Sequence, residues 1–289
     1  MRIPQGARVR GRLIWLAAAL AVTGCGGKNG AESPAASAAP RVTCASPAVA
    51  EIVFALGCGD RVVGVSEFTD WPPEAAQKPQ IGGALAPNRE RILALAPSLI
   101  LAQGRSEVLE SFANAQQIGF KSLPLDTLAD LRAMIIGFAA ALGVADRGRE
   151  LLAKIDADFA AISVCTNTPV FIALGHAPGD LSGLMTSGPG TFLSEIVAKA
   201  GGSNIFSDAQ LLWPKISQET LVRRQPTLIL DFQTASMDAA RQAALIADWE
   251  KLGFQAGRVR ILEEDFLLKP GPRAAQAAAR IAAALCGGK

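Results

Sequence analysis

The sequence predicts an α/β protein made of two parallel-sheet α/β lobes, with a single long rigid helix that joins them and a ligand cleft between the lobes. Three observations lead to this prediction. Short apolar runs alternate with amphipathic stretches along the 289 residues. A segment that begins at Glu90 is repeated from Glu219 onward. Between the two copies, residues 145–165 contain no Pro and carry apolar side chains at helical spacing.

Residues 41–144 are expected to form the N-terminal lobe. The run Leu99–Ala102 follows Pro97 and is apolar throughout, which is typical of a strand buried on both faces. Gly119 and Gly143 end the two helices that precede them. The expected strands are 41–44, 62–65, 99–102 and 121–124, and the expected helices are 47–56, 107–118 and 128–142.

The connecting helix is expected at residues 145–165, with a length of about 30 Å. Residues 166–289 are expected to form the C-terminal lobe. Its expected strands are 170–174, 227–231 and 259–262, and its expected helices are 192–199 and 273–285. Because strands and helices alternate in both halves, the sheets should be parallel.

The internal repeat pairs residues 90–101 with residues 219–230. In both copies a Glu is followed seven places later by a Pro and then by Leu-Ile-Leu. Each copy predicts a short helix with Glu in its first turn, a Pro that ends the helix and a buried strand. If the similarity is not a chance match between two helix–Pro–strand units, each lobe holds one copy.

Residues 1–24 are typical of a signal peptide. Four Arg residues precede the apolar run Leu13–Val22, which is too short to span a bilayer. The run ends in Val22-Thr23-Gly24-Cys25, which resembles the lipobox of bacterial lipoproteins and implies cleavage before Cys25 and lipidation of that residue. An ordinary secretory signal is the alternative. Residues 25–40 are expected to be the lipidated Cys and a flexible tether. The protein is therefore expected outside the cytoplasm, periplasmic or at the cell surface, and anchored to a membrane through its lipid.

Export leaves four further cysteines in an oxidising compartment. Cys165 precedes a predicted strand and Cys286 ends the last predicted helix, so both should lie at the same edge of the second sheet. We therefore expect one disulfide, Cys165–Cys286. Cys44 and Cys58 are expected to be small buried side chains without a partner.

The composition excludes several functions. A net charge of +2 is too small for a nucleic-acid-binding protein. One His and no Tyr exclude a zinc site built from several imidazoles and a haem held by a phenolate. A hydrolytic triad would have to use His176, and no Gly-x-Ser-x-Gly motif is present. We expect no catalytic residue, no metal site and no resident cofactor; an extracellular α/β hydrolase is the remote alternative.

Six short motifs point to a family when they are taken together. They are Ala50–Gly57, Asp60–Val65, Asp70–Pro73, Ser187–Phe192, Ala200–Phe206 and Trp213–Ser217. With these motifs in this order, the chain resembles the substrate-binding proteins of ABC importers for corrinoids, ferric siderophores and haem, and most of all the cobalamin-binding members. The resemblance covers residues 41–286. It implies a monomer that moves little on binding and delivers a small molecule to a membrane permease powered by a cytoplasmic ATPase.

The resemblance also implies roles for single residues. Glu90 and Glu219 match the two acids that pair with Arg residues of the permease; otherwise each acid only favours a helix N-terminus. Phe68 and Trp213 match aromatic residues that touch the corrin, and Lys269 matches a basic residue that reaches the ligand. Phe266 is near the same loop, although ordinary core packing is the alternative for the aromatic residues. Ala84 and Gln103 stand where the cobalamin-binding relatives have Trp, which makes the predicted cleft less aromatic.

The identity of the ligand stays open at this point. His176 follows a predicted strand and could coordinate cobalt or haem iron, although a satisfied or solvent-exposed His is the plainer interpretation. A ferric chelate with negative charge should need a cluster of Arg residues, but only Arg105 and Lys269 are suitably placed. The sequence therefore favours a corrinoid over a ferric siderophore or haem. In each case the metal, cobalt or iron, would belong to the transported ligand.

Overall fold

The computed structural model describes residues 39–83, 86–165, 167–234 and 236–287. The predicted signal peptide, the lipidation site at Cys25, most of the predicted tether and Ala84 lie outside the described residues. Within the described part of the chain, no helix combines the length and the apolar character needed to cross a membrane.

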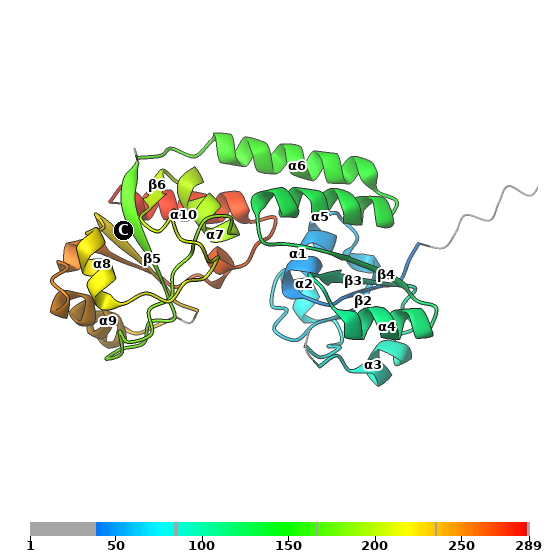
Figure 1. The fold of residues 1–289 in the computed structure, drawn as a ribbon. Coiled ribbons are helices and arrows are strands. Elements are labelled where there is room, and N and C mark those ends of the chain that lie inside the picture. Colours follow the sequence, from blue (N-terminus) through cyan, green and yellow to red (C-terminus); the bar gives the residue numbers. More distant parts are fainter. Residues whose placement is uncertain (1–38, 84–85, 166, 235, 288–289) are drawn as a thin grey trace, which may run out of the picture. The chain divides into compact units, whose positions relative to one another are not determined.

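The N-terminal half contains a four-stranded parallel sheet in the order β2-β1-β3-β4 (Figure 1). Its strands are β1 (Val42–Cys44), β2 (Val62–Val65), β3 (Leu99–Gln103) and β4 (Gly119–Leu123). Its helices are α1 (Pro47–Ala55), α2 (Pro73–Ala76), α3 (Arg89–Ala94), α4 (Glu107–Ala115) and α5 (Leu128–Ala141), with a 3-10 turn, η1 (Gly59–Arg61), before β2. Because all four strands run the same way, their carboxyl ends lie at one edge of the sheet.

The C-terminal half repeats this arrangement, with a second parallel sheet in the order β6-β5-β7-β8 (Figure 1). Its strands are β5 (Thr168–Leu174), β6 (Gly202–Asn204), β7 (Leu228–Phe232) and β8 (Val259–Leu262). Its helices are α7 (Phe192–Lys199), α8 (Gln218–Arg224), α9 (Ala239–Lys251) and α10 (Ala274–Leu285), with 3-10 turns η2 (Ala256–Arg258) and η3 (Asp265–Leu268). The predicted fold class, two parallel-sheet α/β units, is confirmed.

The internal repeat occupies the same place in both sheets. The first copy forms α3 and β3, and the second copy forms α8 and β7. Strand β3 pairs with β1 just as β7 pairs with β5. Glu90 and Glu219 stand in the first turns of their helices, as predicted. The repeated segment therefore marks equivalent helix–strand units in the two halves.

Helix α6 (Ala145–Ala160) follows α5 and precedes the second sheet. It packs against both α5 and α10. It ends at Ala160, short of the predicted end at residue 165, and its 16 residues span about 24 Å rather than about 30 Å. The residues that follow, Ile162, Ser163 and Val164, are poor helix formers, and Cys165 is held by a disulfide.

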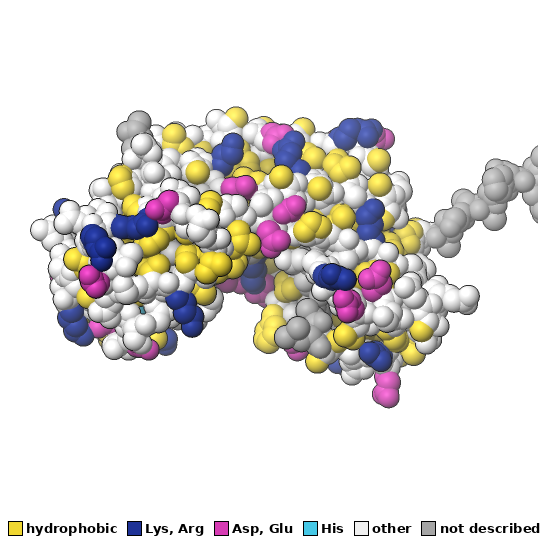
Figure 2. Space-filling model, viewed as in Figure 1, with side chains coloured by type: hydrophobic (Ala, Val, Ile, Leu, Met, Phe, Trp, Pro, Cys, Tyr) yellow, Lys and Arg dark blue, Asp and Glu magenta, His cyan; other side chains and the backbone are white. Residues whose placement is uncertain are grey.

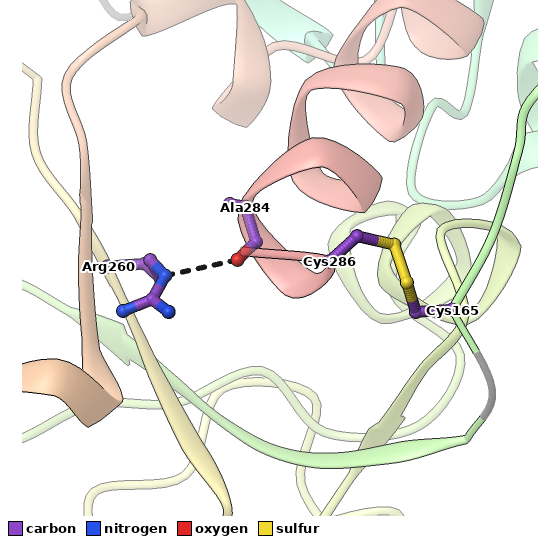
Figure 3. Close-up of a disulfide and its surroundings, with 4 residues drawn as sticks. All are labelled: Cys165, Arg260, Ala284 and Cys286. Atoms are coloured by element: carbon purple, nitrogen blue, oxygen red, sulfur yellow. Dashed lines mark hydrogen bonds between the residues drawn. A yellow bond between two sulfur atoms is a disulfide. The ribbon is translucent and has the colours of Figure 1, made fainter. Parts of the chain in front are cut away.

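Cys165 and Cys286 form a disulfide with a Cα–Cα distance of 5.6 Å (Figure 3). It ties the segment before β5 to the end of α10, where the Nε of Arg260 also donates a hydrogen bond to the carbonyl of Ala284 at 3.1 Å. Cys44 and Cys58 are free and buried. Burial raises the pKa of the Cys44 thiol far above its usual value, which keeps that thiol protonated and unreactive.

The disulfide should contribute measurably to stability. Replacement of both Cys165 and Cys286 by Ser should lower the free energy of unfolding by about 3–5 kcal/mol, because the crosslink restricts a long segment of the unfolded chain. Urea unfolding followed by circular dichroism measures the change. Reduction of the wild type should reproduce the effect, whereas the double variant should not respond to reductant. An unchanged unfolding midpoint in the variant would contradict the expectation.

Candidate functional site

The candidate site is a cavity of about 490 Å³ whose walls come from both halves of the chain. Gln103, Leu174 and Phe232 line it from the carboxyl ends of β3, β5 and β7. Ligand sites of parallel α/β sheets commonly lie beyond the carboxyl ends of the strands. A larger cavity of about 730 Å³ lies along α1 and α6, away from these strand ends.

The walls of this cavity are mostly apolar, and hydrophobic side chains gather in the hollow of the face in Figure 2. The apolar lining residues are Leu125, Leu174, Met185, Phe192, Leu193, Trp213, Phe232, Leu268 and Pro270. Gln103, Asp126 and Thr234 supply polar side chains. No Lys or Arg occurs among the described residues that line the cavity. Such a surface suits a large ligand with an apolar body and polar, uncharged edges.

Trp213 lines the cavity from a loop and is 48% exposed. Two hydrogen bonds hold this loop against the segment before α7. The Gly188 amide donates to the carbonyl of Leu212 at 2.7 Å, and the Thr186 amide donates to the carbonyl of Pro214 at 3.0 Å. A Cβ at position 188 would lie 2.2 Å from the carbonyl oxygen of Leu211, so only Gly permits this approach.

Asn204 holds the same segment in place through three hydrogen bonds. Its Nδ2 donates to the carbonyl of Ser187 at 2.7 Å and to the Oγ of Ser194 at 3.1 Å. Its Oδ1 accepts from the amide of Phe206 at 2.9 Å. Three of the sequence motifs, around residues 187, 204 and 213, therefore join in one structural unit that positions Trp213.

Phe68 is not one of the residues that line this cavity. It follows β2 in a loop, is 79% exposed and has a φ of 61°, a backbone conformation that bulky residues rarely adopt. Its neighbours Ser66 and Thr69 are buried and hydrogen-bonded to each other at 3.1 Å, which anchors the loop. The structure thus presents the Phe68 ring to solvent, and its predicted contact with the ligand stays a prediction.

Lys269 lies between Leu268 and Pro270, which line the cavity, but its ammonium group is engaged elsewhere. Its Nζ is 2.5 Å from an Asp265 oxygen and 3.3 Å from an Asp70 oxygen. Partial burial alone would lower the pKa of Lys269, but the hydrogen bond and charge of Asp265 raise it above its usual value. Lys269 is therefore a cation that two carboxylates already neutralise.

Phe266 does not line the cavity. Its partly buried ring packs against the core, and the guanidinium of Arg273 lies 5.0 Å from its centre. The ring of Trp71 lies 4.9 Å from the same guanidinium. The structure therefore assigns Phe266 to a stacking arrangement with Arg273 and not to the predicted ligand surface.

Arg273 also forms a bidentate ion pair with Glu51. Its Nε and Nη2 are 3.1 Å and 2.9 Å from the two carboxylate oxygens. The side chains of Arg273 and Glu51 are only 19% and 8% exposed. Arg273 precedes α10 and Glu51 lies in α1, so the pair joins the two halves of the chain. Neither residue was among the predicted site residues.

His176 does not line the cavity, and of the two interpretations that the sequence allowed, the structure agrees with the plainer one, a satisfied histidine. Its side chain is fully buried, with Nδ1 2.7 Å from an oxygen of Asp231. The same oxygen accepts a hydrogen bond from the Nε1 of Trp249 at 2.8 Å, and Asp248 lies 3.5 Å from the other ring nitrogen. The imidazole and the indole of Trp249 thus satisfy the buried carboxylate of Asp231, near the end of β7. No group of three or more metal-ligating side chains occurs in the described part of the chain.

The two predicted docking acids are both exposed. Glu90 follows the N-cap residue Asn88 of α3, and Glu219 follows the N-cap residue Ser217 of α8. Glu219 lies 3.0 Å from Arg223 on the next turn. The two acids therefore occupy equivalent positions, in the first turns of the helices that the internal repeat pairs.

Comparisons with known proteins agree with this geometry. The model of a family described as periplasmic binding protein matches residues 42–247. The vitamin B12-binding protein of Pectobacterium carotovorum subsp. carotovorum is 32% identical over 254 residues, which cover 85% of this chain and 88% of the relative.

Two solved structures share the fold. The periplasmic vitamin B12-binding protein of Vibrio cholerae has a TM-score of 0.65 and 26% identity, over 86% of this chain and 97% of that one. The periplasmic haem-binding protein of Roseiflexus sp. RS-1 has a TM-score of 0.69 and 25% identity, over 84% of this chain and 97% of that one. The similar proteins thus include vitamin B12-binding proteins and a haem-binding protein.

Loss of either partner of the Glu51–Arg273 pair should be costly. Glu51→Gln or Arg273→Met should lower the free energy of unfolding by about 3–5 kcal/mol, because the remaining group stays buried without a partner. Arg223→Met is the matched control, since its pair with Glu219 is exposed and should contribute less than about 1 kcal/mol. Chemical unfolding of the three variants tests this. Equal losses in the control and in the Arg273 variant would contradict it.

Proposed function

Because the chain belongs to the periplasmic binding protein family, we propose that it captures a corrinoid outside the cytoplasm and delivers it to an ABC importer. The vitamin B12-binding relatives in Pectobacterium and Vibrio support this choice of ligand. The relatives are binding proteins by name, which supports a role in transport and not in catalysis.

One observation carries the choice of a corrinoid: the polar groups of the cavity. The corrin ring of cobalamin carries neutral amide side chains, whereas haem carries two propionates and ferric siderophores are commonly anionic. Gln103, Asp126 and Thr234 can exchange hydrogen bonds with amides, but a carboxylate beside Asp126 would be repelled. The nearby cation Lys269 is already paired with Asp70 and Asp265. The cavity therefore favours a neutral ligand.

In this proposal the apolar walls supply most of the binding energy. A corrinoid that covers Met185, Trp213 and Leu268, lining residues that keep part of their surface accessible, removes apolar surface from water, at about 25 cal/mol per Å². Trp213 presents the largest ring and would stack on a face of the ligand. Phe68 would close over the ligand from the loop after β2. The metal stays with the ligand, since the buried His176 cannot reach it.

Haem is the second candidate, favoured by the similarity to the haem-binding protein of Roseiflexus. The sequence has no Tyr that could ligate the iron, and its one His is buried. A ferric siderophore is a third candidate within the same class of importers. Both ligands would bring negative charge to a cavity in which Asp126 is the charged lining residue among those described.

The remaining parts of the proposal concern location and partners. We propose that Cys25 carries a lipid that holds the mature protein, as a monomer, at a membrane. Glu90 and Glu219 would pair with Arg residues of the permease, and their separation would set the docking register. The importer's ATPase would supply the energy.

Calorimetric titration tests the ligand. The mature protein with residue 25 replaced by Ser should bind cyanocobalamin and cobinamide with a Kd below about 1 µM, and haemin and ferric siderophores more weakly. Trp213→Ala should weaken corrinoid binding about tenfold or more, because the stacking ring is lost. Leu93→Ala, an exposed residue of α3 outside the cavity, is the matched control. Failure of the wild type to bind either corrinoid would refute the proposal.

Uptake by cells tests the docking acids. The double variant Glu90→Lys/Glu219→Lys should abolish corrinoid uptake while its affinity for the ligand persists, because only the contact with the permease is reversed. The matched control is Glu107→Lys/Glu110→Lys, which reverses two acids in the first turn of α4 and should leave uptake unchanged. Normal uptake with the first variant would refute the docking role.

A further inference from the structure

Gln103 is the residue whose side chain is best placed to give the cavity directional selectivity. It is the last residue of β3, where its backbone pairs with Leu123 of β4. Its exposed side chain lines the cavity among mostly apolar neighbours. A neutral amide here can add a directed hydrogen bond to binding that is otherwise driven by apolar contact.

Ser46 determines which end of that amide faces the ligand. Ser46 is the N-cap residue of α1, and its Oγ accepts a hydrogen bond from the amide of Val49 at 3.3 Å. The hydroxyl proton is donated to the Oε1 of Gln103, at 3.2 Å. The carbonyl end of the Gln103 amide is therefore occupied. Among the described residues, no hydrogen bond engages its Nε2, which leaves two N–H donors available.

We propose that Gln103 is a specificity-determining residue, which donates a hydrogen bond from Nε2 to an amide carbonyl at the edge of the bound corrinoid, and that Ser46 is its positioning residue. This inference rests on the proposed function. The ring periphery of a corrinoid carries acetamide and propionamide groups, whose carbonyl oxygens accept such a bond. Ser46 then has two roles: it caps α1, and it orients the side-chain amide of Gln103.

A purely structural role would leave the chemistry of Ser46 unimportant as long as α1 stays capped. Asp and Asn both cap helices well, but they differ in what they offer Gln103. The Asn side chain caps with its oxygen and still donates from its NH₂ group. An ionised Asp only accepts, so the Gln103 amide should turn its NH₂ group toward residue 46 and its carbonyl toward the ligand. Ser46→Asp and Ser46→Asn therefore form a matched pair.

The experiment measures cyanocobalamin affinity by calorimetry and stability by thermal unfolding. Gln103→Leu should weaken binding about three- to tenfold, which corresponds to the loss of one hydrogen bond. Ser46→Asp should weaken binding by a similar factor, and Ser46→Asn should restore the wild-type affinity. In the Gln103→Leu background, Ser46→Asp should cause no further loss, because its effect acts through Gln103. All variants should unfold near the wild-type temperature.

The outcomes separate the two proposals. Corrinoid binding that is unchanged in Gln103→Leu overturns this inference and leaves the proposed function standing. A further loss from Ser46→Asp in the Gln103→Leu background, or equal losses in Ser46→Asp and Ser46→Asn, overturns the positioning role of Ser46. If the wild type binds neither cyanocobalamin nor cobinamide, the proposed function and this inference both fall.

Discussion

The ion pair between Glu51 and Arg273 is the contact on which the candidate site depends. Glu51 belongs to α1 in the N-terminal half, and Arg273 stands before α10 at the other end of the sequence. Both groups are largely removed from water, so each would be costly to bury alone. The guanidinium satisfies both carboxylate oxygens and lies against the rings of Trp71 and Phe266. Because Arg273 holds the segment that contains Leu268 and Pro270, this contact fixes one wall of the cavity against the N-terminal half.

A second connection fixes another part of the wall. The carboxylate of Glu195 in α7 accepts a hydrogen bond from the amide of Leu128, at the N-terminus of α5, at 2.6 Å. The carbonyl of Asp126 accepts from the amide of Phe192 at 2.5 Å. Asp126 and Phe192 both line the cavity, so the bond that joins them is part of the wall. A cavity whose wall is held by two such connections is largely formed before a ligand arrives, which lowers the entropic cost of binding.

The sequence predicted the elements with a strong local pattern and missed those whose pattern is weak or that depend on distant partners. The apolar runs, the Pro after each repeated helix and the Gly at helix ends are local signals, and they predicted the strands of both sheets except β6. Helix α9 was missed, although Leu245, Ile246 and Trp249 lie on one face, because its Ala-rich remainder has weak contrast. β6 has three residues and forms only by pairing with β5.

Among the site residues, Trp213 was found through its motif. The role of His176 stayed open at the level of sequence because its partners, Asp231 and Trp249, are 55 and 73 positions away along the chain. No local pattern links Glu51 to Arg273 either.

The same long-range pairs explain why so little charge is left for ligand recognition. Arg273 is neutralised by Glu51, and Lys269 by Asp70 and Asp265. Burial alone would raise the pKa of Asp265, but the hydrogen bond and charge of Lys269 hold it below its usual value, so this pair persists until the solution becomes strongly acidic. These two cations thus hold the fold together, and the cavity is lined by rings, aliphatic side chains, the amide of Gln103, the hydroxyl of Thr234 and the carboxylate of Asp126. A site of this kind holds a neutral ligand by shape and by a few neutral hydrogen bonds, and its affinity for such a ligand should depend little on salt.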